Sequence, residues 1–208
     1  MEINHLCSLG QVCQSSRILK DNNWKKCSYP FDWVLSNPKI ILHCLEDDFK
    51  IFLDKSYYLS YTRFTSGHSY YNKNLWCHHN PLMFEDHYNY YIRCVDRFRK
   101  LLQNEDHTLF IMSFVNMDEI PVDLKNNLID FNDKFSKYTK NYKLLVILHL
   151  QNKENQCNVF THHDNIDFLE LHTLSKSDGV MFQNKSDNAY LSDLIKNKYN
   201  FQVKEHVS

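Results

Sequence analysis

Continuous apolar runs and helical periodicities follow one another along this chain. The runs 108–115 and 143–150 are apolar at almost every position, which is typical of strands buried on both faces of a sheet. Between residues 85 and 104, apolar side chains recur at steps of three and four, which predicts an amphipathic helix of about five turns. This alternation of buried strands with helices predicts a mainly parallel sheet.

Weaker patterns indicate the remaining elements. We expect further strands at 3–9, 156–161 and 166–173, and further helices at 12–20, 38–47, 122–139 and 187–197. Residues 49–83 have no sustained period, and we expect loops and short strands there. The pattern favours a three-layer α/β fold with helices on both faces of a mostly parallel sheet. The sheet should have an antiparallel edge, because the last two strands follow each other without a helix between them.

Length and composition exclude several classes of protein. The 208 residues suit one domain, which we expect over 1–208. The three glycines lie too far apart to form a glycine-rich phosphate loop, and we expect no cofactor. The 24 basic and 25 acidic residues form no basic block, so we expect no nucleic-acid partner. No signal peptide or membrane span is evident, so we expect a cytoplasmic protein with no membrane partner, and its oligomeric state stays open.

A cysteine at a strand-turn-helix junction is the first candidate for chemistry. In the segment 8–13 (SLGQVC), Gly10 permits a sharp turn and Cys13 falls in the first turn of the next helix. Backbone N–H groups and the helix dipole favour a thiolate there. The same N–H groups can bind an oxyanion, with Gln11 or Gln14 as a side-chain donor. The alternative is a buried cysteine that packs the helix onto the sheet.

An aspartate and several histidines could complete a catalytic site. Asp32 lies in a rigid aromatic turn, where it can orient an imidazole or cap the next helix. His78 and His79 are adjacent, and either can be the general base for Cys13. His162, on a late strand, is a rival base. The sequence leaves the choice among the three histidines open.

Two arginines on the long predicted helix offer an anion site. Arg93 and Arg97 are one turn apart and can bind a carboxylate or a phosphate. They can equally pair with acidic side chains on neighbouring turns.

The chain has the donor atoms of a zinc site but not their spacing. Thiol and imidazole donors occur at Cys77, His78, Cys157 and His162. No CxxC or HxxxH motif aims two of them at one ion, so we expect no metal.

Four motifs together resemble an uncharacterised family of predicted papain-like cysteine peptidases. They are SLGQVC at 8–13, SYPFDW at 28–33, CHHN at 77–80 and RCVDRF at 93–98. The resemblance covers the chain to about residue 115. It implies Cys13 as the nucleophile, His79 as the base and Asp32 as an orienting carboxylate. It also implies an α+β papain-like fold as the alternative to the α/β fold.

We expect a cysteine-dependent hydrolase or acyl transferase that acts on a peptide or another acyl substrate. The residues expected to contact the substrate are Ser8, Gly10, Gln14, Trp33, Arg93 and Arg97. One alternative is a carbohydrate-modifying transferase that uses a nucleotide-sugar, with Asp32 as its base. Another is a non-catalytic interaction module in which Cys13 belongs to the core.

Overall fold

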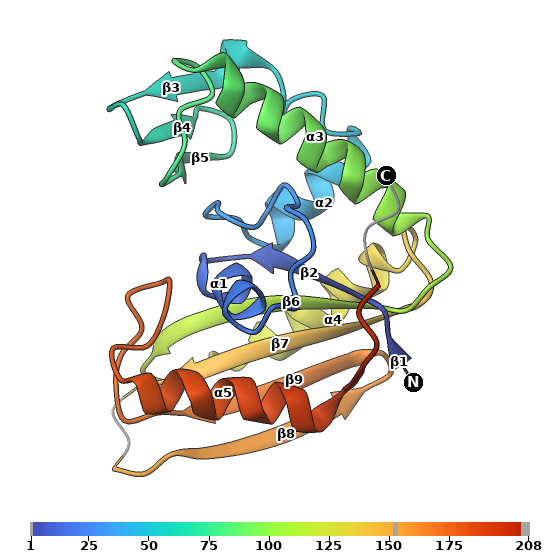
Figure 1. Cartoon of the computed structure of the whole chain (residues 1–208), viewed down its shortest axis with the longest axis vertical. Coiled ribbons are helices and arrows are strands. Elements are labelled where there is room, and N and C mark those ends of the chain that lie inside the picture. The colour runs from blue at the N-terminus through green and yellow to red at the C-terminus, as the bar shows by residue number, and fades with distance from the viewer. Residues whose placement is uncertain (1, 152–153, 205–208) are drawn as a thin grey trace.

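A five-stranded sheet forms the centre of the computed structural model, which describes residues 2–151 and 154–204 (Figure 1). The strand order is β2-β6-β7-β9-β8, and the first four strands run parallel. These strands are β2 (His5–Gly10), β6 (Thr108–Met117), β7 (Tyr142–Leu150) and β9 (Ile166–His172). The fifth, β8 (Cys157–His163), pairs antiparallel with β9 at the edge. The predicted mixed α/β fold with a mainly parallel sheet is confirmed.

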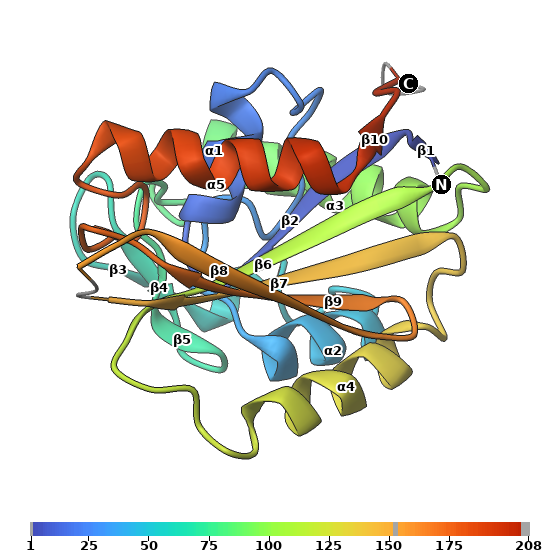
Figure 2. The ribbon, with the colours of Figure 1, turned by 90° about the horizontal axis from the view of Figure 1, so that it is seen from below.

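Helices lie on both faces of this sheet (Figure 2). Helices α1 (Gln14–Asp21) and α5 (Lys185–Lys198) lie on one face, whereas α2 (Pro38–Glu46) and α4 (Leu124–Phe135) lie on the other. Each strand contributes side chains to both faces of the sheet, because successive side chains point in opposite directions. In β6, Leu109 and Ile111 pack with α1 and α5, whereas Phe110 and Met112 pack with α2 and α4.

The long helix α3 (Glu85–Leu102) leads into β6, and its apolar stripe packs into the core on the α2 side. Residues 49–83, for which only loops and short strands were predicted, contain a 3-10 turn and a three-stranded antiparallel sheet. Its elements are η1 (Lys55–Tyr57), β3 (Tyr58–Ser60), β4 (Ser66–His68) and β5 (Asn72–Trp76). Tyr58, Leu75 and Trp76 join this small sheet to the same core as α3.

The two ends of the described chain lie side by side. Strand β1 (Glu2–Ile3) pairs in parallel with β10 (Asn200–Phe201), which follows α5. None of the helices seen over 2–151 and 154–204 combines the length and the apolar character needed to span a bilayer.

Candidate active site

Cys13 lies where β2 ends and α1 begins, at the carboxyl edge of the parallel strands. The turn between the two elements has positive φ at two successive residues, +76° at Gly10 and +59° at Gln11. The Ser36 hydroxyl holds this turn, since it donates to the Leu9 carbonyl at 2.7 Å and accepts from the Gln11 amide at 3.1 Å. The predicted strand-turn-helix junction is confirmed, and this edge of a parallel sheet is where α/β proteins generally bind ligands.

Ser8 fixes the same junction from inside. Its hydroxyl lies 2.7 Å from the Ser15 hydroxyl of α1 and accepts from the Gly10 amide at 3.1 Å. The side chain is fully buried, so its partners are groups of the protein itself. Ser8 therefore positions the turn that carries Cys13.

The Cys13 thiol is buried, with 4% of its surface exposed. Burial, together with the smaller effects of Cys77 and Asp32, raises the pKa of the thiol to about 11, while the cationic Lys25 opposes this shift. Cys77 begins the CHHN segment, so the start of this segment lies within electrostatic range of the thiol. At neutral pH the thiol of Cys13 is protonated and shielded from solvent.

Asp32 is held by a cation rather than by an imidazole. Its Oδ2 lies 2.8 Å from Lys25 Nζ and accepts from the Tyr29 amide at 2.8 Å, and only 1% of the residue is exposed. Lys25 Nζ also donates to Ser16 of α1 at 2.8 Å and lies 4.8 Å from the ring centroid of Trp33. The SYPFDW turn is thereby tied to α1, and Lys25 is a site residue that the sequence did not single out.

The two adjacent histidines lie in different surroundings. His79 is half-buried, and burial with the charges of His87 and His78 lowers its pKa to about 4. Its Nδ1 lies 3.2 Å from the hydroxyl of Tyr91. His78 is exposed, and its ring meets Trp33 edge-on at 6.3 Å between centroids.

Tyr91 contacts His79 and is influenced electrostatically by Cys13. Burial raises the pKa of the Tyr91 hydroxyl, and the charges of its neighbours, Cys13 among them, raise it further. Over the described residues, no hydrogen bond joins Cys13 directly to His78 or His79, and none joins Asp32 to either. Tyr91 was not among the predicted site residues, and its spacing of twelve residues from His79 carries no local signal.

Three other candidates lie outside this arrangement. Arg93 is exposed on α3, and Arg97 donates to the Ser28 carbonyl at 3.4 Å, which braces the SYPFDW turn. His162 is on β8, four strand spacings or about 19 Å from β2 across the sheet. There it binds Asp167 at 2.7 Å. The structure does not bring His162 to Cys13.

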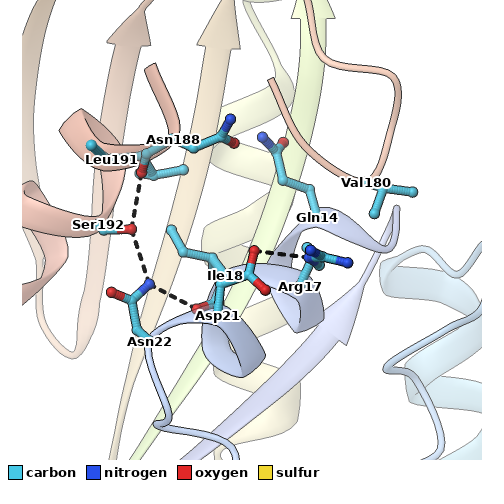
Figure 3. Close-up of a pocket in the computed structure, with 10 residues that line it drawn as sticks. Gln14, Arg17, Ile18, Asp21, Asn22, Val180, Asn188, Leu191 and Ser192 are labelled. Carbon is cyan, nitrogen blue, oxygen red and sulfur yellow. Dashed lines mark hydrogen bonds and ion pairs between the residues drawn. The ribbon is translucent and has the colours of Figure 1, made fainter. Parts of the chain in front are cut away.

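Gln14, which was expected to contact the substrate of Cys13, lines a separate cavity. This cavity lies between α1 and α5 (Figure 3), and Cys13 is not among the residues that line it. Across the portion of the chain described, no group of three or more His, Cys, Asp or Glu side chains is placed to hold a metal ion.

Comparison with known proteins gives one match. The family model described as "Putative papain-like cysteine peptidase (DUF1796)" matches residues 4–152. This segment contains the four motifs, the β2–α1 junction and the strands β6 and β7. Neither the curated proteins nor the solved structures contain a match to the chain.

Proposed function

The chain belongs to the family described as "Putative papain-like cysteine peptidase", and from this membership we propose that it is a thiol-dependent hydrolase or acyl transferase with Cys13 as its nucleophile. One observation carries the proposal. Among the described residues, Cys13 is the one cysteine that follows the carboxyl end of a parallel strand and begins a helix, and it lies within electrostatic range of Cys77 in the CHHN segment, which supplies two histidines. The expected substrate class is a peptide or another acyl compound.

The reaction would proceed through a thioester. The Cys13 sulfur attacks the carbonyl carbon of the substrate, and the N–H groups of the first turn of α1, which have no partner within the helix, bind the oxyanion. The bond to the leaving group breaks, and the leaving group takes up the proton that the thiol lost. Water then cleaves the thioester in a hydrolase, or a second nucleophile takes the acyl group in a transferase.

His79 is our choice for the base, with His78 as the alternative. His79 is neutral at pH 7 because its pKa is about 4, its Nδ1 lies 3.2 Å from the Tyr91 hydroxyl, and Cys13 in turn acts electrostatically on that hydroxyl. The Tyr91 hydroxyl can pass the proton by donating to His79 Nδ1 while accepting from Cys13. The pKa of about 11 at Cys13 and that of about 4 at His79 both make this transfer unfavourable in the resting protein. We therefore expect substrate binding to be required for reactivity.

Lys25 and Asp32 set the charge near the thiol. The ammonium group of Lys25 lowers the pKa of Cys13, and the carboxylate of Asp32 holds that group at 2.8 Å. Asp32 would then be a positioning residue that acts through Lys25. The role expected from the sequence, in which Asp32 orients an imidazole, stays a prediction.

Two kinds of electrophile test the proposal on the full chain. Iodoacetamide at pH 7 should modify the exposed Cys157 first and Cys13 slowly, because the Cys13 thiol is buried and protonated. A panel of peptidyl vinyl sulfones, in which bound peptide carries the electrophile, should reverse this order at least tenfold. Modified positions are identified by mass spectrometry of proteolytic fragments.

Matched variants identify the nucleophile. Cys13→Ser should abolish the fast vinyl sulfone reaction and leave only the slow one at Cys157, whereas Cys77→Ser, which replaces another thiol of the region, should retain the fast reaction. His79→Gln should slow adduct formation at Cys13 more than His78→Gln does. Vinyl sulfones that modify Cys157 but never Cys13 would show that Cys13 is not a nucleophile towards peptides.

A further inference from the structure

A cavity of about 160 Å³ separates α1 from the first half of α5. Its wall is partly apolar, from Ile18 and Leu191, and partly polar, from Gln14, Arg17, Asn188 and Ser192 (Figure 3). A cavity of about 150 Å³ is large enough for a benzene-sized molecule. The space therefore suits a ligand of a few non-hydrogen atoms rather than a single water molecule.

Gln14 presents an unused amide to this cavity. The residue is 3% exposed, and neither the nitrogen nor the oxygen of its side chain has a hydrogen-bond partner within the described residues. In Figure 3 the amide is directed into the space that faces α5. An unpaired buried amide destabilises the folded protein, so a ligand that offers one acceptor and one donor would remove this penalty.

The neighbouring polar side chains already have partners. Asn188 donates to the Phe182 carbonyl at 2.8 Å and accepts from the Phe182 amide at 2.9 Å. Ser192 donates to the Asn188 carbonyl at 2.9 Å and accepts from the Asn22 amide group at 2.9 Å. These groups are held in place by the fold, which leaves Gln14 as the group that needs a partner.

Arg17 adds a positive charge to the same wall. Its Nε donates to Asp21 at 2.8 Å, one turn along α1, and the side chain is 37% exposed. The terminal nitrogens of a guanidinium group can bind a carboxylate while Nε is engaged elsewhere. Asp21 also lines the cavity, which thus combines an unpaired amide, the terminal nitrogens of an ion-paired guanidinium group and a small apolar surface.

We propose that this cavity binds a small carboxylate that carries an amide group, of the size of an N-acylated amino acid. Gln14 pairs with the amide of the ligand, Arg17 binds its carboxylate, and Ile18 with Leu191 contacts its apolar part. The site does not depend on the proposed function, because Cys13 does not line the cavity.

Titration of the full chain with N-acetylglycine tests the site, with acetamide and acetate as partial ligands. N-acetylglycine should raise the melting temperature in a concentration-dependent manner and should bind more tightly than either partial ligand. Gln14→Met should weaken binding of N-acetylglycine and of acetamide at least tenfold. The same variant should melt at a higher temperature than the wild type when no ligand is present, since it lacks the unpaired amide.

The carboxylate contact has its own variant and control. Arg17→Gln should weaken the binding of N-acetylglycine at least tenfold and leave the binding of acetamide unchanged. Lys20→Gln removes one positive charge from the exposed side of the same helix, outside the cavity. This variant should bind both ligands as the wild type does. If Gln14→Met does not fold, Gln14→Glu replaces it as the test, because it keeps the length of the side chain. Gln14→Glu should not bind N-acetylglycine, because its carboxylate repels that of the ligand.

The outcomes separate this site from the thiol chemistry. Cys13→Ser should bind N-acetylglycine as the wild type does. The proposal is overturned if N-acetylglycine does not shift the melting temperature at tens of millimolar, or if Gln14→Met binds it as tightly as the wild type. Neither result would bear on the labelling of Cys13.

Discussion

At Gly10 both the backbone angle and the surrounding space exclude a side chain. The residue has φ of +76°, and a Cβ built on it would collide with the Ser36 hydroxyl and lie 2.9 Å from the Phe31 carbonyl oxygen. Gly10→Ala should therefore lower the free energy of unfolding by about 2–4 kcal/mol, from left-handed strain plus overpacking. Urea denaturation measures this loss.

Gly179 is the matched control for this substitution. Its φ of +89° is also positive, but a Cβ there would meet nothing within 4 Å. Gly179→Ala should thus show the cost of strain alone, about 1–2 kcal/mol. Equal losses at the two glycines would mean that the packing of Ser36 and Phe31 against the turn is not what requires glycine at residue 10.

At the scale of elements, a buried histidine joins the carboxyl ends of three strands. His149 of β7 is fully buried, and its Nδ1 accepts from the Asn116 amide of β6 at 3.0 Å. Its Nε2 lies 2.8 Å from the Thr173 hydroxyl after β9, which itself donates to the Ser175 carbonyl at 2.6 Å. Both contacts require a neutral ring protonated on Nε2.

This network predicts a loss of stability in acid. Burial lowers the pKa of His149 from 6.5 to about 4 against the opposing charge of Asp187, and the neighbouring His172 acts in the same direction as burial. Between these two values the unfolded chain binds a proton that the folded protein does not, so the free energy of unfolding should fall as the pH falls. His149 accounts for about 3 kcal/mol of this fall.

Denaturation from pH 7 to pH 4 checks this prediction. His149→Gln should be less stable than the wild type at pH 7, because its hydrogen bonds are changed, but its stability should depend less steeply on pH below 6.5. His163→Gln, at an exposed histidine of β8, should retain the wild-type slope. An unchanged slope in His149→Gln would contradict the assigned role.

At the scale of the whole molecule, the segment after α5 joins the two ends of the described chain. The Gln202 amide donates to the Ile3 carbonyl at 2.9 Å, and the Lys204 amide donates to the Asn4 carbonyl at 3.0 Å. Phe201 packs on Trp24, which follows α1, with 4.8 Å between ring centroids. The C-terminal segment therefore covers the edge of the core between α1 and α5.

Phe201→Ala should weaken the contact between the segment after α5 and the start of the described chain. We expect a loss of about 1–2 kcal/mol in the free energy of unfolding, since the ring is only half-buried. The amides of Gln202 and Lys204 should also exchange with solvent faster than in the wild type, which hydrogen exchange detects. Phe64→Ala, at a ring that is 62% exposed, should change stability by less than about 0.5 kcal/mol. Equal effects of the two substitutions would contradict a role for Phe201 in closure.

Hydrophobic periodicity was sufficient to predict most of the elements. The apolar runs at 108–115 and 143–150 became β6 and β7, and the periodic stretch at 85–104 became α3. Such patterns are local, because the residues that lie on one face of a strand or helix are two to four positions apart in the sequence. The 49–83 stretch has no such pattern, and its three short strands depend on contacts with the rest of the core.

The junction at Gly10 and Cys13 could be predicted from local sequence, because a sharp turn before a helix needs only neighbouring residues. Which groups meet at this junction depends on how distant segments pack. In the folded chain Asp32 forms an ion pair with Lys25, and His79 forms a hydrogen bond with Tyr91. His162 lies on the strand at the far edge of the sheet. The packing of the described residues also leaves the amide of Gln14 buried without a partner. Such pairings join residues distant in the chain, and they follow from strand order and helix packing rather than from local spacing.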